Sequence, residues 1–384
     1  MEKIKIMTIF GTRPEAIKMA PLVKELESRD EIESIVCVTA QHRQMLDQVL
    51  DLFEITPQYD LNIMQTKQTL TGITNRVLDG LEKIYDDVEP DMILVHGDTT
   101  TTFAGALSAF YKQIKVGHVE AGLRTFDKYF PFPEEMNRKL TGAIADLHFA
   151  PTLGSKANLL REGVSEDQVI ITGNTVIDAM EFTVEDNYKF DTEELNNIDF
   201  ENKKVIMVTA HRRENWGEGI ENICKALKNI VETNEDVELV YLVHLNPIVK
   251  DVVCKYLDNM ERVHLLSPLD TKETHNLMNK CFMVMTDSGG LQEEAPHLGK
   301  PVLVLRDVTE RPEAVEAGTV KLLGTDFDRI CEEANKLLMD TEAYKNMSKA
   351  INPYGDGMAS KRIVDSILKY YKMTDRIIEE FKIK

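Results

Sequence analysis

The sequence lacks the features of several large protein classes. It has five cysteines in 384 residues, none in a C-x-x-C pair, and a single tryptophan. An odd and scattered set of cysteines predicts reduced thiols rather than a disulfide framework or a zinc site. The chain also lacks any run of about 18 apolar residues, and its N-terminus lacks the apolar core of a signal peptide. We therefore expect a cytoplasmic protein without a membrane span.

Positively charged residues are also outnumbered by negatively charged ones. The chain has 45 Lys and Arg against 65 Asp and Glu, which gives a formal net charge of -20. Such a chain repels nucleic acid and anionic membranes at long range, so neither is an expected partner. A small anionic ligand is still compatible with this charge where cations gather locally. The length exceeds one ordinary core and predicts two domains.

Short β-rich runs alternate with helical patterns in two consecutive sets. The first set lies at 4–10, 32–39, 91–97, 115–120, 146–151 and 169–174. The second set lies at 203–211, 237–244, 261–266, 281–289, 301–305 and 319–324. Apolar strands that alternate with helices predict an α/β fold, in which a parallel sheet is covered on both faces. A long helical pattern over 358–384 closes the chain.

The first predicted strand, turn and helix, over 4–26, have neither the G-x-G-x-x-G nor the G-K-[ST] motif of nucleotide sites. In place of those glycines, Arg13 and Lys18 flank a predicted helix N-terminus, which favours phosphate. A solvated helix cap with two surface cations explains this stretch equally well. Because ligands of doubly wound sheets bind beyond the carboxyl ends of the strands, the residues after the other strands are informative.

Carboxylates follow two further strands of the first set. Asp98 follows one strand, where it alone would be interpreted as a helix N-cap. Glu120 ends an apolar strand, and such a carboxylate is either paired with a cation such as Arg124 or functional. Glu134 and Arg138 share a predicted helix face at i, i+4, a spacing that alone predicts a surface ion pair of about 0.3–0.5 kcal/mol. Their position shortly after Glu120 favours a common site.

The second set of strands carries its own polar residues. His211, Arg212 and Arg213 follow its first strand, close to Trp216. A lone histidine is more often structural than catalytic. A histidine followed by two arginines at a strand end favours a function instead.

A Ser-Gly-Gly turn after another strand is the most specific single motif. Ser288, Gly289 and Gly290 lead into a predicted helix and expose backbone N–H groups to an anion. Glu293 or Glu294, one turn further, lies where a carboxylate meets ribose hydroxyls, and Arg311 adds a cation. We interpret this run as a nucleotide site rather than a plain turn. Together, the strand-end groups of both domains predict a cleft for a diphosphate-bearing ligand, with acid–base groups beside it.

Nine long motifs then connect the chain with a known family. They are FGTRPEAIKMAPL, TAQHRQMLDQVL, HGDTTTTFAGALSAFY, HVEAGLRT, PFPEEMNR, TAHRREN, DSGGLQEEAP, TERPEAVEAGT and NPYGDG. In this order they resemble the non-hydrolysing UDP-N-acetylglucosamine 2-epimerases over nearly the whole chain. The resemblance implies a GT-B architecture of two Rossmann-like domains with a deep interdomain cleft. It also implies reversible interconversion of UDP-GlcNAc and UDP-ManNAc by a cytoplasmic homodimer that uses no metal or nicotinamide.

The same motifs assign residues to roles. The resemblance implies that the catalytic residues are Asp98, Glu120, Glu134 and His211. It implies substrate binding by Arg13, Lys18, Arg138, Ser288, Gly289, Gly290, Glu294 and Arg311. A regulatory site for a second UDP-GlcNAc is implied at Gln41, His42, Gln44, Lys67, Arg212 and His244, with Glu134 shared. Lys67 stands where the family often has arginine, and because lysine cannot make a bidentate contact, we expect weaker regulation.

We expect an N-terminal domain over 1–175 plus 360–384, a crossing segment over 176–200, and a C-terminal UDP-binding domain over 201–359. The chemistry expected from the resemblance is elimination of UDP to a 2-acetamidoglucal and re-addition, which feeds cell-surface polysaccharide synthesis. Three alternatives stay open: a hydrolysing 2-epimerase, a GT-B glycosyltransferase and a nucleotide-sugar sensor without turnover. The regulatory residues favour the non-hydrolysing type over the hydrolysing one. Three acidic groups at one reaction centre fit proton transfer at C2 better than transfer to an acceptor.

Overall fold

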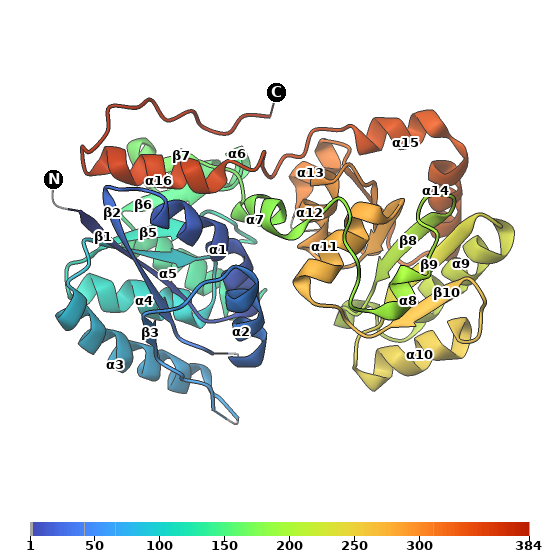
Figure 1. The fold of residues 1–384 in the computed structure, drawn as a ribbon, viewed down its shortest axis with the longest axis horizontal. Coiled ribbons are helices and arrows are strands. Elements are labelled where there is room, and N and C mark those ends of the chain that lie inside the picture. The colour runs from blue at the N-terminus through green and yellow to red at the C-terminus, as the bar shows by residue number, and fades with distance from the viewer. Residues whose placement is uncertain (1–2, 42, 66, 310, 384) are drawn as a thin grey trace. The chain divides into compact units, whose positions relative to one another are not determined.

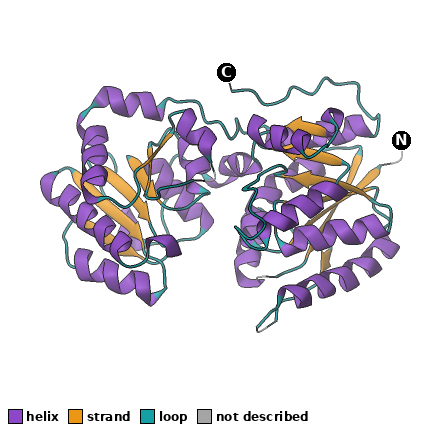
Figure 2. Ribbon diagram, turned by 180° about the vertical axis from the view of Figure 1, so that it is seen from behind, coloured by secondary structure: helices purple, strands orange, loops and turns teal. Residues whose placement is uncertain are grey.

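The computed structural model describes residues 3–41, 43–65, 67–309 and 311–383. They form two compact units. Unit 1 comprises the residues up to Phe182 together with Tyr354–Lys382, and unit 2 comprises Thr183–Pro353 with the residue after Lys382. Each unit is built on one parallel sheet with helices on both faces (Figures 1 and 2). The structure thus confirms the predicted α/β class, and the chain changes units within the segment 176–200 and again after Pro353.

The sheet of unit 1 has the strand order β3-β2-β1-β4-β5-β6-β7. Its strands are β1 (Ile4–Phe10), β2 (Ile32–Val38), β3 (Tyr59–Asp60), β4 (Met92–His96), β5 (Lys115–Val119), β6 (Leu147–Ala150) and β7 (Val169–Ile171). All six strands predicted in the first set are present, and the two-residue β3 was not predicted. The order reverses between β1 and β4, and such a switch point is where doubly wound sheets bind ligands.

Helices cover both faces of this sheet. They are α1 (Arg13–Glu27), α2 (Arg43–Leu52), α3 (Leu70–Val88), α4 (Thr100–Tyr111), α5 (Glu134–Ile144), α6 (Leu153–Arg161), α7 (Thr175–Thr183) and α16 (Ala359–Tyr370). Successive side chains of β1 point to opposite faces of the sheet. Ile6 and Phe10 pack with α1, α2 and α16 on one face, whereas Met7 and Ile9 pack with α3 and α4 on the other. Among the described residues, no helix is long and apolar enough to cross a membrane.

The C-terminal helix is shorter than the predicted helical pattern over 358–384. It ends at Tyr370, and Lys372 then adopts a left-handed backbone with φ 56°. The following tail is irregular, and the N–H of Phe381 donates to the carbonyl of Ile171 at the end of β7, at 2.8 Å. Phe381 is buried while Ile377 is 88% exposed. The spacing of these apolar residues resembles a helical period, but Phe381 is buried in an irregular tail, with the Arg362 guanidinium 5.7 Å from the centroid of its ring.

The sheet of unit 2 has the strand order β10-β9-β8-β11-β12-β13, with a switch point between β8 and β11. Its strands are β8 (Lys204–Thr209), β9 (Val237–Leu242), β10 (Val263–Leu266), β11 (Met283–Thr286), β12 (Val302–Val304) and β13 (Val320–Leu322), all six as predicted. Its helices are α8 (Glu193–Asn196), α9 (Glu218–Thr233), α10 (Pro247–Leu257), α11 (Thr271–Lys280), α12 (Leu291–His297), α13 (Pro312–Glu316), α14 (Phe327–Met339) and α15 (Thr341–Ser348). Ile220, Ile223 and Leu227 recur at helical spacing, so α9 packs one face on the sheet beside α10 and α14.

Three histidines are buried in the sheet of unit 1. Burial lowers the pKa of His96 on β4 and of His148 on β6 to about 4, and that of His118 on β5 to about 3. Each ring is neutral in the folded state, whereas the unfolded chain takes up protons below its ordinary pKa of about 6.5. The lowered pKa values therefore have little effect on the free energy of unfolding above about pH 6.5. Below that pH they reduce it progressively as the pH falls toward 4. At pH 5 each ring lowers the free energy of unfolding by about 2 kcal/mol relative to pH 7.5.

Replacing His118 should weaken this acid sensitivity. The ring Nε2 of His118 hydrogen-bonds the carbonyl of Gly97 at 2.7 Å, and the amide of His118→Gln can donate to the same oxygen. We expect the loss of unfolding free energy between pH 7.5 and pH 5 to shrink by about 2 kcal/mol, measured by chemical denaturation. As a control, His264→Gln replaces a side chain that is 25% exposed in unit 2. An identical pH dependence for His118→Gln and the wild type would contradict this assignment.

Candidate functional site

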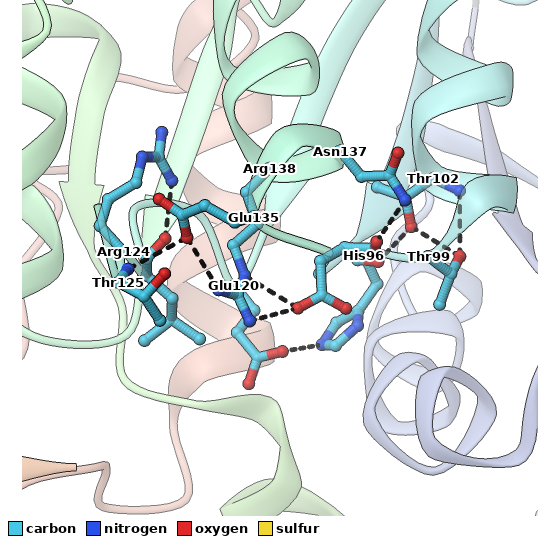
Figure 3. A network of polar contacts seen from close by, with 12 residues as sticks. His96, Thr99, Thr102, Glu120, Arg124, Thr125, Glu135, Asn137 and Arg138 are labelled. Carbon is cyan, nitrogen blue, oxygen red and sulfur yellow. Dashed lines mark hydrogen bonds and ion pairs between the residues drawn. The ribbon is translucent and has the colours of Figure 1, made fainter. Parts of the chain in front are cut away.

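In unit 1, predicted site residues gather around the imidazole of His96, at the carboxyl end of β4 (Figure 3). Its Nε2 lies 3.3 Å from Oε2 of Glu120, which follows β5. The charges of Glu120, Lys18 and Asp98 all act on the pKa of this ring, although burial has the largest effect. Lys18 comes from α1 and Asp98 follows β4. The switch point of unit 1 therefore brings together three of the residues predicted from strand ends.

The Glu120 carboxylate is held on several sides. It forms an ion pair with Lys18, and Nδ2 of Asn174 donates to its Oε1 at 2.8 Å. Its backbone is left-handed, with φ 59°, a conformation that costs energy for a residue with a Cβ. Arg124, the cation that sequence offered as a partner, instead binds Glu162 through Nε at 3.0 Å and Nη2 at 2.7 Å. The side chain of Glu120 is thus positioned by groups other than Arg124.

Asp98 is bound by Arg138 from α5. Nε and Nη2 of Arg138 lie 2.8 and 2.6 Å from Oδ2 of Asp98. Nη1 of the same guanidinium donates to Oε2 of Glu135 at 3.2 Å. The spacing of Glu134 and Arg138 favoured a pair between them, but none of the described ion pairs joins these two. Glu134 is the first residue of α5 and is half-buried.

Glu135, which the sequence did not single out, organises the segment between β5 and α5. Its side chain is fully buried and accepts the N–H groups of Thr125 and Phe126 at 3.0 and 3.1 Å (Figure 3). It also accepts from Arg138, so one carboxylate connects the loop with the arginine that binds Asp98. Only the i, i+3 spacing of Glu135 and Arg138 hints at this pair.

A second buried carboxylate, Glu15, connects the loops on the two sides of the switch point. Its Oε2 accepts the N–H groups of Gly11 and Thr12 at 3.1 and 2.9 Å, and its Oε1 accepts the hydroxyl of Thr99 at 2.7 Å. Burial raises its pKa, which these hydrogen bonds oppose. The T-x-x-E capping box that begins at Thr12 was the available sequence signal. Arg13, the first residue of α1, is half-buried within this same turn.

In unit 2, His211 follows β8 and lies beside Asp287, which follows β11. Nδ1 of His211 lies 3.5 Å from Oδ1 of Asp287. Its ring stacks on that of His244, with 5.1 Å between centroids and 9° between planes. Burial lowers the pKa of His211, while the Asp287 carboxylate opposes that shift. The predicted catalytic histidine and the predicted regulatory histidine are therefore direct neighbours.

The Ser288–Gly290 turn lies against Arg311. A Cβ on Gly289 would lie 2.5 Å from Nη1 of Arg311, so the guanidinium lies directly against the backbone of this turn. Arg311 forms an ion pair with Glu293, and Oε2 of Glu294 lies 3.5 Å from Nε2 of His275. The predicted nucleotide-binding turn, its cation and its carboxylates thus belong to one cluster.

The predicted regulatory residues divide between the units. In unit 1, Gln41 accepts the Thr101 hydroxyl at 3.2 Å, and its carbonyl accepts Nε2 of Gln68 at 3.2 Å. These bonds place the segment that carries Lys67 against Gln41, and the side chains of Lys67 and Gln44 are exposed. Arg212 and His244 belong to unit 2. His42 lies outside the described residues.

Comparison with known proteins decides the family. Residues 24–368 match the family model described as UDP-N-acetylglucosamine 2-epimerase. The chain belongs to this family. A protein of Clostridium acetobutylicum is 73% identical over 384 residues, which is all of both chains. The UDP-N-acetylglucosamine 2-epimerase of Bacillus subtilis is 59% identical over 371 residues, or 97% of each chain.

A solved structure supports the family and the fold together. The crystal structure of the UDP-GlcNAc 2-epimerase of Neisseria meningitidis bound to UDP-GlcNAc has a TM-score of 0.86 and 51% sequence identity. It covers 95% of this chain and 100% of its own. These findings confirm the UDP-N-acetylglucosamine 2-epimerase family, its GT-B-like fold and its enzyme class, an epimerase. The prediction of no metal stays a prediction. Among the residues outside the six undescribed positions, no three or more His, Cys, Asp or Glu side chains group to hold a metal ion.

Proposed function

We propose that this epimerase interconverts UDP-GlcNAc and UDP-ManNAc without net hydrolysis. The observation that carries the proposal is the arrangement around His96, where two carboxylates each have their own cation. Arg138 binds Asp98, and Lys18 binds Glu120. Inversion at C2 requires one proton-transfer group for each face of the sugar, and Asp98, Glu120 and Glu134, the first residue of α5, are the candidates.

The C2 proton of the intact sugar nucleotide is barely acidic, so the C1–O bond to UDP breaks first. The electron pair of that bond goes to the phosphate oxygen, and the oxocarbenium-like C1 acidifies the C2 proton. A carboxylate removes this proton to give 2-acetamidoglucal and UDP. UDP then adds back to C1 while C2 receives a proton on its opposite face. No oxidant or reductant is consumed.

The leaving diphosphate needs positive charge and hydrogen-bond donors. In unit 2 we assign this role to His211 and to the N–H groups of Gly289 and Gly290, since the N–H of Ser288 donates to Oγ1 of Thr286 at 2.9 Å. Glu294 and Arg311 bind the rest of UDP in this scheme. Arg311 suits the role because it lies against the Ser-Gly-Gly turn.

Product analysis tests this proposal against hydrolysis. A hydrolysing 2-epimerase would release UDP and free ManNAc. We expect the purified protein to convert UDP-GlcNAc to an equilibrium mixture of UDP-GlcNAc and UDP-ManNAc. Anion-exchange chromatography measures the ratio of the two. The same mixture should form when the reaction starts from UDP-ManNAc with a small amount of UDP-GlcNAc added, because UDP-GlcNAc is also the proposed activator. Accumulation of UDP and free ManNAc would contradict the proposal.

We further propose that a second UDP-GlcNAc activates the enzyme through the residues around Gln41 and His244. The stacking of His244 on His211 supports a direct connection between the regulatory and the catalytic residues. The family resemblance also leads us to propose a cytoplasmic homodimer without metal or nicotinamide, whose product feeds cell-surface polysaccharide synthesis.

Replacing His244 should change the response to substrate concentration. We expect His244→Ala to reduce the sigmoidal character of the rate curve against UDP-GlcNAc, because the stacked ring is lost. Initial rates over a wide range of substrate concentration measure this effect. The matched control is Leu245→Ala, an adjacent side chain that is 68% exposed. An unchanged curve for His244→Ala would remove the regulatory claim.

A further inference from the structure

Asp287 binds the loop that carries His211. It is the first residue after β11, and its side chain is fully buried. Its Oδ2 accepts the N–H of His211 at 2.7 Å, the N–H of Arg212 at 2.7 Å and Nδ2 of Asn215 at 3.1 Å. Three donors from the segment after β8 therefore converge on one oxygen. The carboxylate fixes the backbone on the opposite side of the switch point.

The second oxygen of Asp287 faces the imidazole of His211. This Oδ1 is buried without a hydrogen-bond partner among the described residues, and Nδ1 of His211 lies 3.5 Å away. Side chains in ligand-free sites often have longer hydrogen bonds that shorten when the substrate binds. The side chain of His211 is 40% exposed, whereas that of Asp287 is 0% exposed. The carboxylate is thus buried behind a histidine that a ligand can reach.

We propose that Asp287 is a positioning residue that holds the proton of His211 on Nδ1. The inference rests on the proposed function, in which His211 contacts the leaving diphosphate. A carboxylate is only an acceptor, so the imidazole nitrogen that faces it carries hydrogen. Nε2 is then the nitrogen that meets the diphosphate, and when it is protonated it donates a hydrogen bond as negative charge develops there. Asp287 also stabilises the imidazolium form.

Other groups face this pair and affect its titration. The ring of His244 stacks on His211, and the Arg212 guanidinium follows it in sequence; both lower the pKa of His211. Tyr241 from β9 is buried close to Asp287, and burial raises its pKa well above the ordinary value. Asp287 is the group that favours the protonated ring.

The substitution Asp287→Asn tests the role at nearly constant volume. The amide oxygen can still accept backbone N–H groups, but the NH₂ group would donate to Nδ1 and shift the ring proton to Nε2. In protein labelled with ¹⁵N-histidine, we expect the His211 ring signals to show protonated Nδ1 in the wild type and protonated Nε2 in Asp287→Asn. We expect kcat to fall roughly 10²-fold with KM within about threefold, because the neutral amide no longer stabilises the imidazolium form of His211 as charge develops on the diphosphate.

A double-mutant cycle separates positioning from a merely structural role. If Asp287 acts through His211, Asp287→Asn should reduce kcat by less than about threefold in a His211→Ala background. The matched control is Asp178→Asn in unit 1, because Asp178 is a buried carboxylate that accepts the N–H groups of Ala359 and Ser360 at 3.2 and 2.7 Å. This control should leave the His211 ring signals and kcat as in the wild type.

Two outcomes would overturn the inference. One is an unprotonated Nδ1 in the wild type, which can be seen even if Asp287→Asn does not fold. The other is a loss of kcat for Asp287→Asn that is as large in the His211→Ala background as in the wild type. Because the ring signals need no turnover, failure of this inference is distinct from failure of the proposed epimerisation.

Discussion

The variant Glu120→Gln should lose about 10²- to 10⁴-fold in kcat while it still binds UDP-GlcNAc. Glutamine has nearly the shape of glutamate but cannot remove a proton from C2. Glu120 is almost fully buried and is held by Lys18, by Asn174 at 2.8 Å and by His96 at 3.3 Å. These contacts fix the carboxylate in one position, so no other side chain readily replaces it. Steady-state rates together with UDP-GlcNAc titration measure the two effects.

A matched control for this variant is Glu238→Gln in unit 2. Glu238 is also a poorly exposed carboxylate beside a histidine, with its Oε2 at 2.9 Å from Nε2 of His264. It lies outside the residues assigned to the reaction, so kcat should stay within about twofold of the wild type. Turnover close to wild type in Glu120→Gln would remove Glu120 from the catalytic residues.

The variant Asp98→Asn is expected to have the second-largest effect, a loss of about 10²-fold or more in kcat. The substitution removes the charge that faces the Arg138 guanidinium, whose Nε and Nη2 both bind Oδ2 of Asp98. It therefore removes one proton-transfer candidate and one of the two carboxylates that bind Arg138, the other being Glu135. The loss should appear in kcat more than in KM, because the carboxylate acts during the reaction rather than in binding UDP.

Asp146→Asn is the control for this charge removal. The side chains of Asp98 and Asp146 are both 26% exposed, and each is paired with a cation, Arg138 and Lys115 respectively. Asp146 binds Lys115 at 2.8 Å and also accepts the N–H of Val116 at 3.0 Å. A similar loss of kcat in both variants would show that Asp98→Asn acts by disturbing the fold rather than by removing a catalytic group.

The strands and the positions of site residues after them could be predicted from the sequence. Apolar runs such as 4–10 and 92–96 are local signals, and a parallel sheet places all their carboxyl ends at one edge. That is why Lys18, Asp98 and Glu120 could be expected together before any coordinates. The helical period of 358–384 was misleading beyond Tyr370, because the backbone of the tail bonds to Ile171 at the end of β7 instead of continuing the helix.

The partners of the charged residues could not be predicted in the same way. Arg138 has Glu134 at helical spacing, yet it binds Asp98 and Glu135. Arg124 is four residues from Glu120, yet it binds Glu162. Such choices depend on which side chains the folded sheet brings together, not on local spacing. The buried carboxylate of Asp287 was missed for the same reason, because its hydrogen bonds join loops far apart in the sequence, whereas the local capping box at Thr12 could have indicated Glu15 but not its bond to Thr99.

Proton NMR of the purified protein with UDP-GlcNAc in D₂O tests the central claim most directly. We predict that UDP-ManNAc forms with deuterium at C2, because the proton removed by one group is replaced from another that exchanges with solvent. Deuterium should also enter C2 of the remaining UDP-GlcNAc as the reaction reverses. UDP-ManNAc that retains protium at C2, or UDP with free ManNAc as the products, would contradict the account.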